Sequence, residues 1–230
     1  MKQRAVIFDV DGVLVDSYAA HFAAWQQVAA RLGRAITEDE FAATFGRRNR
    51  DIFDALWPDA VTEAEAGPLG DWKEERYREI LAADFPAMDG ARELVDALAA
   101  AGFALAVGSS GPAENVRAAV EGLGCADRFA ATVNGKEVRR GKPDPEVFLK
   151  AAVKLGLKPR CCAVIEDAVA GVEAAGRAGM TPIAITGTAP RERLAAAGAA
   201  VVVDSLRDLS PKRIAALIAG NGKTTTDFRR

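Results

Sequence analysis

Short runs of β-branched and other apolar residues recur along the chain, separated by longer alanine-rich stretches in which apolar residues follow helical spacing. This alternation is typical of a parallel sheet, because parallel strands are joined by crossover helices that bury both sheet faces. It predicts an α/β fold with a Rossmann-like parallel sheet and three layers, α/β/α. The expected strands lie at 4–9, 104–109, 129–133, 161–166, 182–186 and 200–203.

The interval from 17 to 85 interrupts this pattern. It shows no convincing strand but several amphipathic helical patterns, for example around Trp25, Phe41 and Trp57. A connection between a strand and the next helix ordinarily takes a few residues, so an interval of this length predicts a separate domain. We expect an α/β core domain at 1–16 and 86–220, an inserted all-helical domain at 17–85, and a disordered tail at 221–230.

The overall charge excludes several classes of partner. The chain has 30 lysines and arginines against 32 acidic residues, a formal net charge of −2, and no long basic run. Nucleic acids and membrane surfaces are therefore not expected as partners. Asp9 and Asp11 interrupt the first apolar run, which argues against a signal peptide, and no run approaches the about 18 apolar residues of a membrane span.

The cysteines indicate a reducing compartment. Cys125, Cys161 and Cys162 are an odd set without the spacing of a metal site or of a disulfide framework. We expect them to be small core residues of a cytoplasmic protein. We also expect a monomer, with a homodimer as the alternative. The sequence itself contains no pattern that determines the oligomeric state.

Asp9 and Asp11 follow the first predicted strand, within the segment VIFDVDGVLVDS. Because side chains alternate along a strand, carboxylates two residues apart point the same way and would share one site. Asp-Gly is also a common turn signal, so a turn or capping role is the alternative. Two carboxylates beside a buried strand repel each other and lose hydration, which a divalent cation would offset. Ligands bind at the carboxyl ends of parallel strands, which favours a functional pair.

Three more predicted strand ends bear polar groups. Ser109 and Ser110 offer hydroxyl and backbone N–H groups that can hold phosphate oxygens. Lys142 adds a positive charge, and Glu166 and Asp167 add two carboxylates. Taken singly, each could be a helix cap or a solvated loop charge. Together they supply the nucleophile, the oxygen ligands for a metal, the phosphate cradle and the lysine that phosphoryl transfer needs.

With these motifs, the sequence resembles a known family, the haloacid dehalogenase superfamily. The resemblance rests on four motifs in the family's order, FDVDGVLVDS, VGSS, GKPDP and IEDAVAGVEAA, and extends to about residue 210. It is closest to the phosphatase and β-phosphoglucomutase branch, in which a helical cap of the C1 type follows the first motif. The resemblance therefore implies that the inserted helical domain is a cap that contributes to substrate specificity.

The resemblance also implies roles for the motif residues. Asp9 would be the nucleophile and a Mg²⁺ ligand, and Asp11 the general acid and base, whose backbone carbonyl also binds Mg²⁺. Asp167 would be a further metal ligand, supported by Glu166, while Ser109 and Lys142 would hold the transferred phosphoryl group. Asp9 would attack phosphorus and form an aspartyl phosphate, which water or a hydroxyl group activated by Asp11 would then cleave. Relatives that cleave carbon–halogen bonds lack an aspartate at the position of Asp11, so dehalogenase activity is not expected.

Two cap residues resemble substrate-binding positions of β-phosphoglucomutases. His21 lies where those enzymes have a histidine that bonds the general acid and a sugar hydroxyl, and Lys73 lies where they have a cap lysine. The alternatives are a helix histidine packed between Tyr18 and Trp25, and a solvated helix charge for Lys73. Gly46, Arg47 and Ser110 complete the candidate substrate-binding residues.

Two departures from the mutases concern the second phosphate of a bisphosphate. The segment after Ser110 is Gly-Pro-Ala instead of polar, and Asn49 lies at the position of the cap arginine; whether Arg47, Arg48 or Arg50 replaces it is open. A mutase must hold both phosphates and exclude water. We therefore rank a Mg²⁺-dependent phosphatase for a small phosphorylated metabolite, in particular a phosphosugar, before a phosphohexomutase. A non-catalytic binding or regulatory module is the alternative of another class, and the clustered carboxylates argue against it.

Overall fold

The computed structural model describes residues 4–221, which form two compact units. The core unit combines Met1–Val15 with Ala87–Arg230, and the cap unit is Asp16–Pro86. Apart from Asn221, the tail expected at 221–230 lies outside the described residues. Among residues 4–221, no helix combines the length and the apolar character needed to cross a membrane.

The core unit is built on a parallel sheet of six strands in the order β3-β2-β1-β4-β5-β6. β1 is a central strand, and its last residue, Phe8, lies beside Val107 of β2 and Ile165 of β4. This confirms the predicted α/β class with a Rossmann-like parallel sheet. The strands are β1 Ala5–Phe8, β2 Ala104–Gly108, β3 Ala131–Val133, β4 Cys162–Glu166, β5 Thr181–Ile185 and β6 Val201–Val203.

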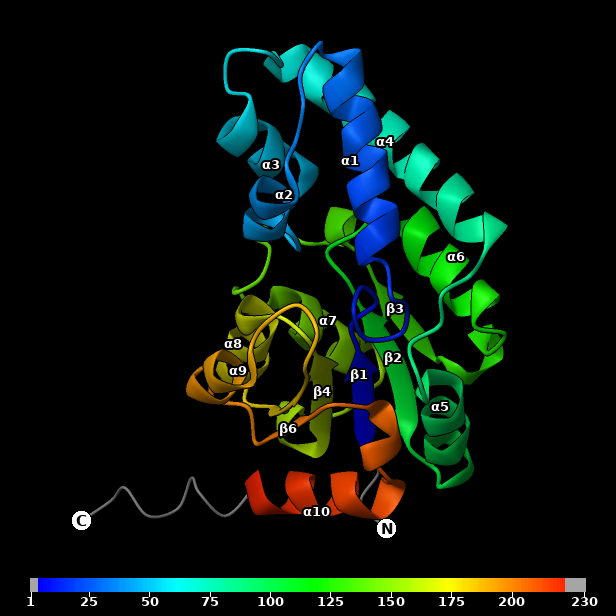
Figure 1. The fold of residues 1–230 in the computed structure, drawn as a ribbon. Helices are drawn as coiled ribbons and strands as arrows, with labels where there is room; N and C mark the ends of the chain where they lie inside the picture. Colours follow the sequence, from blue (N-terminus) through cyan, green and yellow to red (C-terminus); the bar gives the residue numbers. More distant parts are fainter. Residues whose placement is uncertain (1–3, 222–230) are drawn as a thin grey trace, which may run out of the picture. The chain divides into compact units, whose positions relative to one another are not determined.

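Helices cover the sheet on both faces, as the direction of the crossovers requires. From β1 to β3 the chain moves toward one edge of the sheet, and from β3 to β6 it moves back toward the other. With right-handed crossovers, α5 and α6 therefore lie on one face and α7, α8 and α9 on the opposite face (Figure 1). The core helices are α5 Ala91–Ala100, α6 Ala113–Gly122, α7 Glu146–Lys154, α8 Val169–Arg177, α9 Arg191–Ala196 and α10 Pro211–Asn221.

Because helices cover both faces of the sheet, the strands are continuous apolar runs in the sequence. Every residue of β1, β4 and β5 is buried. On one face, Ile7 and Val164 pack with Phe148 of α7 and Ala174 of α8. A strand between two helical layers has no solvent face on which polar residues would alternate.

Five of the six strands are shorter than predicted, β1 and β3 by two residues each and β2, β4 and β6 by one. β1 ends at Phe8 instead of residue 9, and β3 begins at Ala131 instead of 129. Phe129 does not extend β3, because it closes the short helix η1 and its ring packs edge-on against Phe8, with 6.0 Å between ring centroids. The short 3-10 helices are η1 Ala126–Arg128, η2 Gly135–Glu137, η3 Pro159–Cys161 and η4 Leu206–Asp208.

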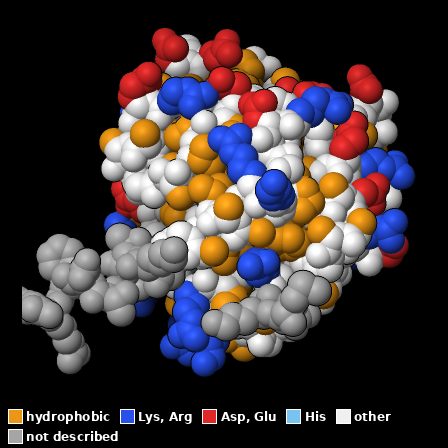
Figure 2. Space-filling model, turned by 90° about the horizontal axis from the view of Figure 1, so that it is seen from below, with side chains coloured by type: hydrophobic (Ala, Val, Ile, Leu, Met, Phe, Trp, Pro, Cys, Tyr) orange, Lys and Arg blue, Asp and Glu red, His pale blue; other side chains and the backbone are white. Residues whose placement is uncertain are grey.

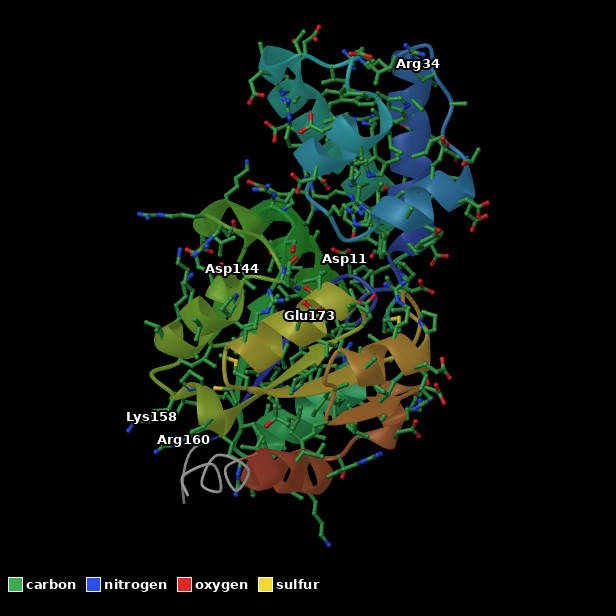
Figure 3. The ribbon with its side chains drawn as sticks, turned by 90° about the vertical axis from the view of Figure 1, so that its left-hand side faces the viewer. Asp11, Arg34, Asp144, Lys158, Arg160 and Glu173 are labelled. Atoms are coloured by element: carbon green, nitrogen blue, oxygen red, sulfur yellow. The ribbon has the colours of Figure 1, made fainter. Side chains whose placement is uncertain are left out.

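The amino ends of the strands are closed by α10, which contacts α5, β4, β5 and η3. Figure 2 looks from below at the side on which α10 lies in Figure 1. Hydrophobic side chains gather near the middle of this face, between lysine and arginine side chains, and acidic side chains lie toward the rim. Figure 3 shows Lys158 and Arg160, just before β4, near this end of the core unit, and Asp11 nearer its opposite end.

The cap unit consists of four helices and contains no strand. Capping boxes start two of them: Thr37 pairs with Glu40, and Thr62 with Glu65, so orphan backbone N–H groups are bonded at each start. Its own apolar core includes Trp25 and other aromatic side chains from all four helices. The cap helices are α1 Tyr18–Arg31, α2 Glu38–Thr44, α3 Asn49–Leu56 and α4 Glu63–Ala83.

Candidate active site

Three carboxylates meet at the carboxyl edge of the sheet. Asp9 follows β1, Glu166 ends β4 and Asp167 follows it. The backbone N–H of Asp9 donates to the carbonyl of Ile165 at 3.0 Å, so the pairing of β1 with β4 continues to this point. One carboxylate oxygen from each of the three residues lies within 4.8 Å of the others, and all three residues are buried. The register of two neighbouring strands thus brings together acids that are far apart in the sequence.

Lys142, from the loop between β3 and α7, lies against this carboxylate cluster. Its Nζ is 2.9 Å from Oδ1 of Asp9 and 2.6 Å from Oε1 of Glu166, and its side chain is 8% exposed. Burial alone would lower the pKa of Lys142, but the charges of Asp9 and Glu166 raise it above its ordinary value. The lysine is therefore a permanent cation between the two carboxylates.

Three carboxylates share the carboxylate cluster with a single lysine, and the pKa values of two of these acids are raised. The pKa of Asp9 is raised to about 7, because the raising effects of burial, Glu166 and Asp11 outweigh the lowering effect of Lys142. Burial, Glu166 and Asp9 together raise the pKa of Asp167 well above its usual value. A hard divalent cation fits this arrangement, because clustered carboxylate oxygens are the ligands that Mg²⁺ prefers and a further positive charge would relieve the repulsion.

Glycines make room for the cluster. A Cβ on Gly12 would lie 2.0 Å from Oδ2 of Asp167, and the φ of Gly12 is 71°, which favours glycine. A Cβ on Gly171 would lie 1.8 Å from the carboxylate of Glu166. The same carboxylate accepts hydrogen bonds from the backbone N–H groups of Asp167 and Ala168, at 3.0 and 3.1 Å. Glu166 is thus fixed from several sides.

Ser109 lies at the same edge of the sheet. It follows Gly108, the last residue of β2, and is 2% exposed. Its hydroxyl accepts a hydrogen bond from the N–H of Gly111 at 3.0 Å, just before α6 begins at Ala113. Ser110 is half-buried, next to it in the turn. The two serines therefore lie where a strand passes into a helix, a place where hydroxyl and N–H groups can bind anions.

Asp11 is placed by a turn instead of by the strand. β1 ends at Phe8, and the N–H groups of Leu14 and Val15 donate to the carbonyl of Val10 at 2.8 and 3.1 Å. The strand alternation that predicts parallel side chains for Asp9 and Asp11 therefore does not reach Asp11. Its charge still raises the pKa of Asp9. The three carboxylates whose oxygens lie together are those of Asp9, Glu166 and Asp167, without Asp11.

His21 and Lys73 meet inside the cap unit. The Nζ of Lys73 lies 2.7 Å from Nδ1 of His21 and donates to Oε1 of Glu74 at 3.0 Å. Lys73 is 2% exposed, so the alternative of a solvated helix charge is wrong. The ring of His21 is buried and stacks on Tyr77, with 3.8 Å between the ring centroids.

Asn49, at the position of the mutase cap arginine, joins the same network. Its side-chain amide donates to Oε1 of Glu74 at 2.8 Å. The neighbouring arginines form ion pairs within the cap unit: Arg48, just before α3, pairs with Asp51, and Arg50 pairs with Asp54 and Glu63. Arg47 is exposed and makes no ion pair with any described residue. Gly46 has a φ of 82°, and a Cβ there would meet no atom within 4 Å.

Thr188 is a site residue that the sequence interpretation missed. It lies in the loop after β5, and its hydroxyl donates a short hydrogen bond to Oδ2 of Asp167. The available signal was its place just beyond a predicted strand end, the same signal that singled out Ser109. A threonine in a Gly-Thr loop is too common in turns to be noticed by residue type alone.

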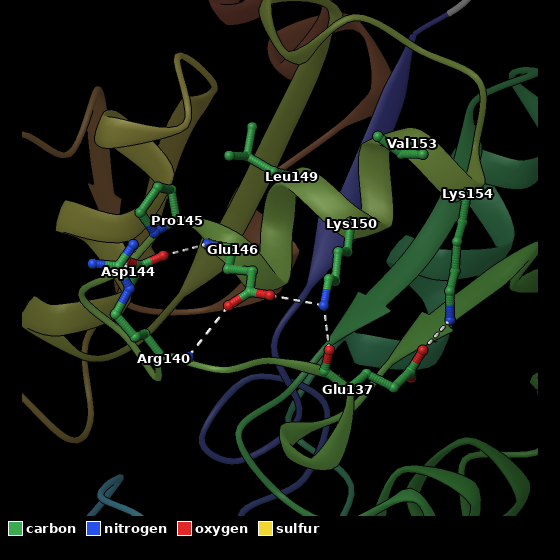
Figure 4. A pocket seen from close by; sticks show the side chains of 9 residues that line it. All are labelled: Glu137, Arg140, Asp144, Pro145, Glu146, Leu149, Lys150, Val153 and Lys154. Carbon is green, nitrogen blue, oxygen red and sulfur yellow. Dashed lines mark hydrogen bonds and ion pairs between the residues drawn. The ribbon is translucent and has the colours of Figure 1, made fainter.

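A separate groove runs along α7 and the loop before it in the core unit (Figure 4). Its charges are paired with one another. Glu146 accepts from Lys150 at 2.7 Å and from the backbone N–H of Arg140 at 3.2 Å, and Lys154 pairs with Glu137 at 2.6 Å. The carboxylate cluster, in contrast, has excess negative charge, and it is the better candidate for the active site.

Comparisons with known proteins agree with this geometry. The model of the haloacid dehalogenase-like hydrolases matches residues 3–179. A β-phosphoglucomutase of Mycobacterium bovis is 34% identical over 244 residues, covering 90% of this chain and 92% of the relative. A phosphorylated carbohydrates phosphatase of Thermotoga maritima is 32% identical over 184 residues, covering 78% and 83%.

The fold comparison leads to the same group. The crystal structure of a β-phosphoglucomutase from Clostridium difficile superposes with a TM-score of 0.84 and 25% identity, covering 95% of this chain and 98% of that one. The matching family model, the two relatives and this superposition together identify the family of the chain. The chain is an enzyme of the haloacid dehalogenase-like hydrolase family, in its β-phosphoglucomutase-like branch.

Proposed function

We propose that the chain is a Mg²⁺-dependent phosphatase that hydrolyses a small phosphorylated metabolite, in particular a phosphosugar, through an aspartyl phosphate on Asp9. The observation that supports this most is the contact of Lys142 with both Asp9 and Glu166, next to Asp167, at the carboxyl edge of the sheet. A nucleophilic carboxylate, a fixed cation and spare oxygen ligands are the groups that phosphoryl transfer needs.

Each group has a proposed task. Asp9 attacks phosphorus, and Asp11 first donates a proton to the leaving oxygen and then accepts one from the attacking water. Lys142 and Ser109 hold the oxygens of the transferred phosphoryl group. Asp9, Asp167, Glu166 and the backbone carbonyl of Asp11 would hold Mg²⁺, which when bound offsets negative charge on the phosphoryl oxygens.

The cap network favours hydrolysis over mutase chemistry. Asn49 donates to Glu74, and Glu74 also accepts from Lys73. At the position of the cap arginine the chain thus presents an amide bonded to a carboxylate, which is a poor partner for a second phosphate. A phosphohexomutase is the second candidate, because a relative of 34% identity is named a β-phosphoglucomutase and because His21 and Lys73 lie together.

We also propose that the cap unit moves as a body over the core unit during turnover. The linkers run side by side: Asp16 N–H donates to the carbonyl of Pro86 at 2.8 Å, and Met88 N–H to that of Leu14 at 3.1 Å. Rotation at this paired segment would bring His21 and Lys73 to the substrate. A substrate-bound structure in which neither residue lies near the ligand would contradict this proposal.

Phosphate release from p-nitrophenyl phosphate tests the reaction. We expect turnover that requires Mg²⁺, and its loss in Asp9→Asn, which keeps the shape of the side chain but removes the nucleophile. Asp127→Asn is the matched control, because Asp127 is a surface residue paired with Arg128. Full activity of Asp9→Asn would refute the role of Asp9.

A second assay separates phosphatase from mutase. The enzyme is given β-glucose 1-phosphate with a trace of the 1,6-bisphosphate, and inorganic phosphate and glucose 6-phosphate are both measured. We expect free phosphate to accumulate. Formation of glucose 6-phosphate without free phosphate would reverse the ranking and make the mutase the better proposal.

A further inference from the structure

Asp167 differs from Glu166 in how its carboxylate is held. Glu166 contacts Lys142 and accepts two backbone N–H groups, so its orientation is fixed by several bonds. Among residues 4–221, the side chain of Asp167 accepts a hydrogen bond from one group alone, the hydroxyl of Thr188. The orientation of this carboxylate therefore depends on a single hydrogen-bond donor from the loop after β5.

We propose that Thr188 is a positioning residue that orients Asp167 for a divalent cation. The inference rests on the proposed function and deepens it, because it adds to the metal site a residue outside the four motifs. A carboxylate has about four lone-pair positions, so a bond to the Thr188 hydroxyl leaves room for a cation. Partners that orient metal ligands in this way commonly contribute about 10–100-fold to metal affinity.

The loop after β5 is anchored on both sides of Thr188. Before it, the N–H of Thr186 donates to the carbonyl of Val203 at 2.9 Å, a backbone bond that does not depend on the side chain of Thr186. After it, Ala189 is buried and packs with Leu194 of α9. The hydroxyl of Thr188 is thus held toward the carboxylate cluster by ordered backbone, although the residue itself is exposed.

Oδ2 of Asp167 is confined from the other side as well. A Cβ on Gly12 would lie only 2.0 Å from this oxygen, so the backbone of the first motif passes close to it. The oxygen is held between the turn after β1 and the hydroxyl of Thr188. Without the hydroxyl, the carboxylate can rotate away from Asp9 and Glu166, and the oxygen ligands no longer converge.

Metal binding in the absence of substrate tests this role. Bound Mn²⁺ is measured from the loss of the EPR signal of free Mn²⁺ with the full-length protein, and Mg²⁺ affinity follows from competition. We expect Thr188→Val to weaken both affinities about 10-fold or more. We expect Thr188→Ser, which keeps the hydroxyl, to bind like the unsubstituted protein.

Thr186→Val is the matched control, because it removes a neighbouring hydroxyl that bonds Asp204 instead of the carboxylate cluster. Thermal unfolding without metal verifies that each variant is folded, and Thr188→Ala replaces Thr188→Val if that variant is not. Unchanged affinity in Thr188→Val, an equal loss in Thr186→Val, or a loss in Thr188→Ser equal to that in Thr188→Val would overturn the inference. No binding of Mn²⁺ or Mg²⁺ by the unsubstituted protein would refute the proposed metal site itself, and the role of Thr188 with it.

Discussion

Lys142→Met should destabilise the core unit strongly, because it leaves the carboxylate cluster without its cation. The lysine is 8% exposed and contacts Asp9 and Glu166, which are themselves buried. Removing one partner of a buried ion pair costs about 3–5 kcal/mol, since the remaining charge stays in a medium that solvates it poorly. With an m-value of about 2 kcal/mol/M, the urea midpoint should fall by about 1.5–2.5 M.

The two units can be followed separately. All three tryptophans and both tyrosines lie in the cap unit, so intrinsic fluorescence reports the cap, whereas far-UV circular dichroism also reports the core. We expect Lys142→Met to shift a transition seen by circular dichroism and to leave the fluorescence transition in place. Saturating Mg²⁺ should restore part of the lost stability, because a bound cation replaces the missing charge.

Lys150→Met is the matched control for burial. Lys150 pairs with Glu146 at 2.7 Å, a distance close to that of the Lys142 pairs, but its side chain is 42% exposed. An exposed pair contributes about 0.5 kcal/mol. If Lys142→Met lowered the midpoint no more than Lys150→Met, the claim that Lys142 compensates buried negative charge would be refuted.

Three further outcomes are expected. Gly12→Ala should abolish phosphatase activity, because the new Cβ would collide with Asp167. Gly33→Ala is the control: Gly33 has a similar φ of 66° but no atom within 4 Å of the Cβ position, so the substitution should lower stability by about 1 kcal/mol and leave activity unchanged. Chelation by EDTA should stop p-nitrophenyl phosphate hydrolysis and Mg²⁺ should restore it; activity that persists in EDTA would contradict the metal requirement. Thr62→Ala should remove the capping box of α4 and lower cap stability by about 1 kcal/mol in the fluorescence-detected transition; an unchanged transition would show that the cap does not depend on it.

The sheet could be predicted from the sequence because its signal is local. A strand buried on both faces is a short apolar run, and each such run recurs before a helical pattern, so six strands appear near the predicted places. The errors concern the ends of the strands. For example, Phe129 was predicted to belong to β3, but its ring packs against Phe8 and the strand begins at Ala131. That contact joins residues far apart in the sequence, and no local pattern reveals it.

The candidate site was predictable in part for the same reason. Polar residues at strand ends, such as Asp9, Ser109 and Asp167, are visible as interruptions of apolar runs, and parallel strands bring these ends to one edge. The pairing of Asp9 with Asp11 by strand alternation did not hold, because β1 ends at Phe8. Helical spacing alone could not decide whether Lys73 is a solvated helix charge or a cap lysine, and its contact with His21 was visible only in the structure.

The sequence by itself determined the α/β alternation, the inserted helices and the acidic and basic groups at the strand ends, since these depend on hydrophobicity and on neighbours along the chain. Only the tertiary structure decided that Lys142 touches Asp9 and Glu166, that Asn49 and Lys73 share Glu74, and that Thr188 bonds Asp167. Such contacts depend on the order and register of strands and helices, which are set by the packing of the whole unit. They therefore cannot be recognised from the residues nearby in the sequence.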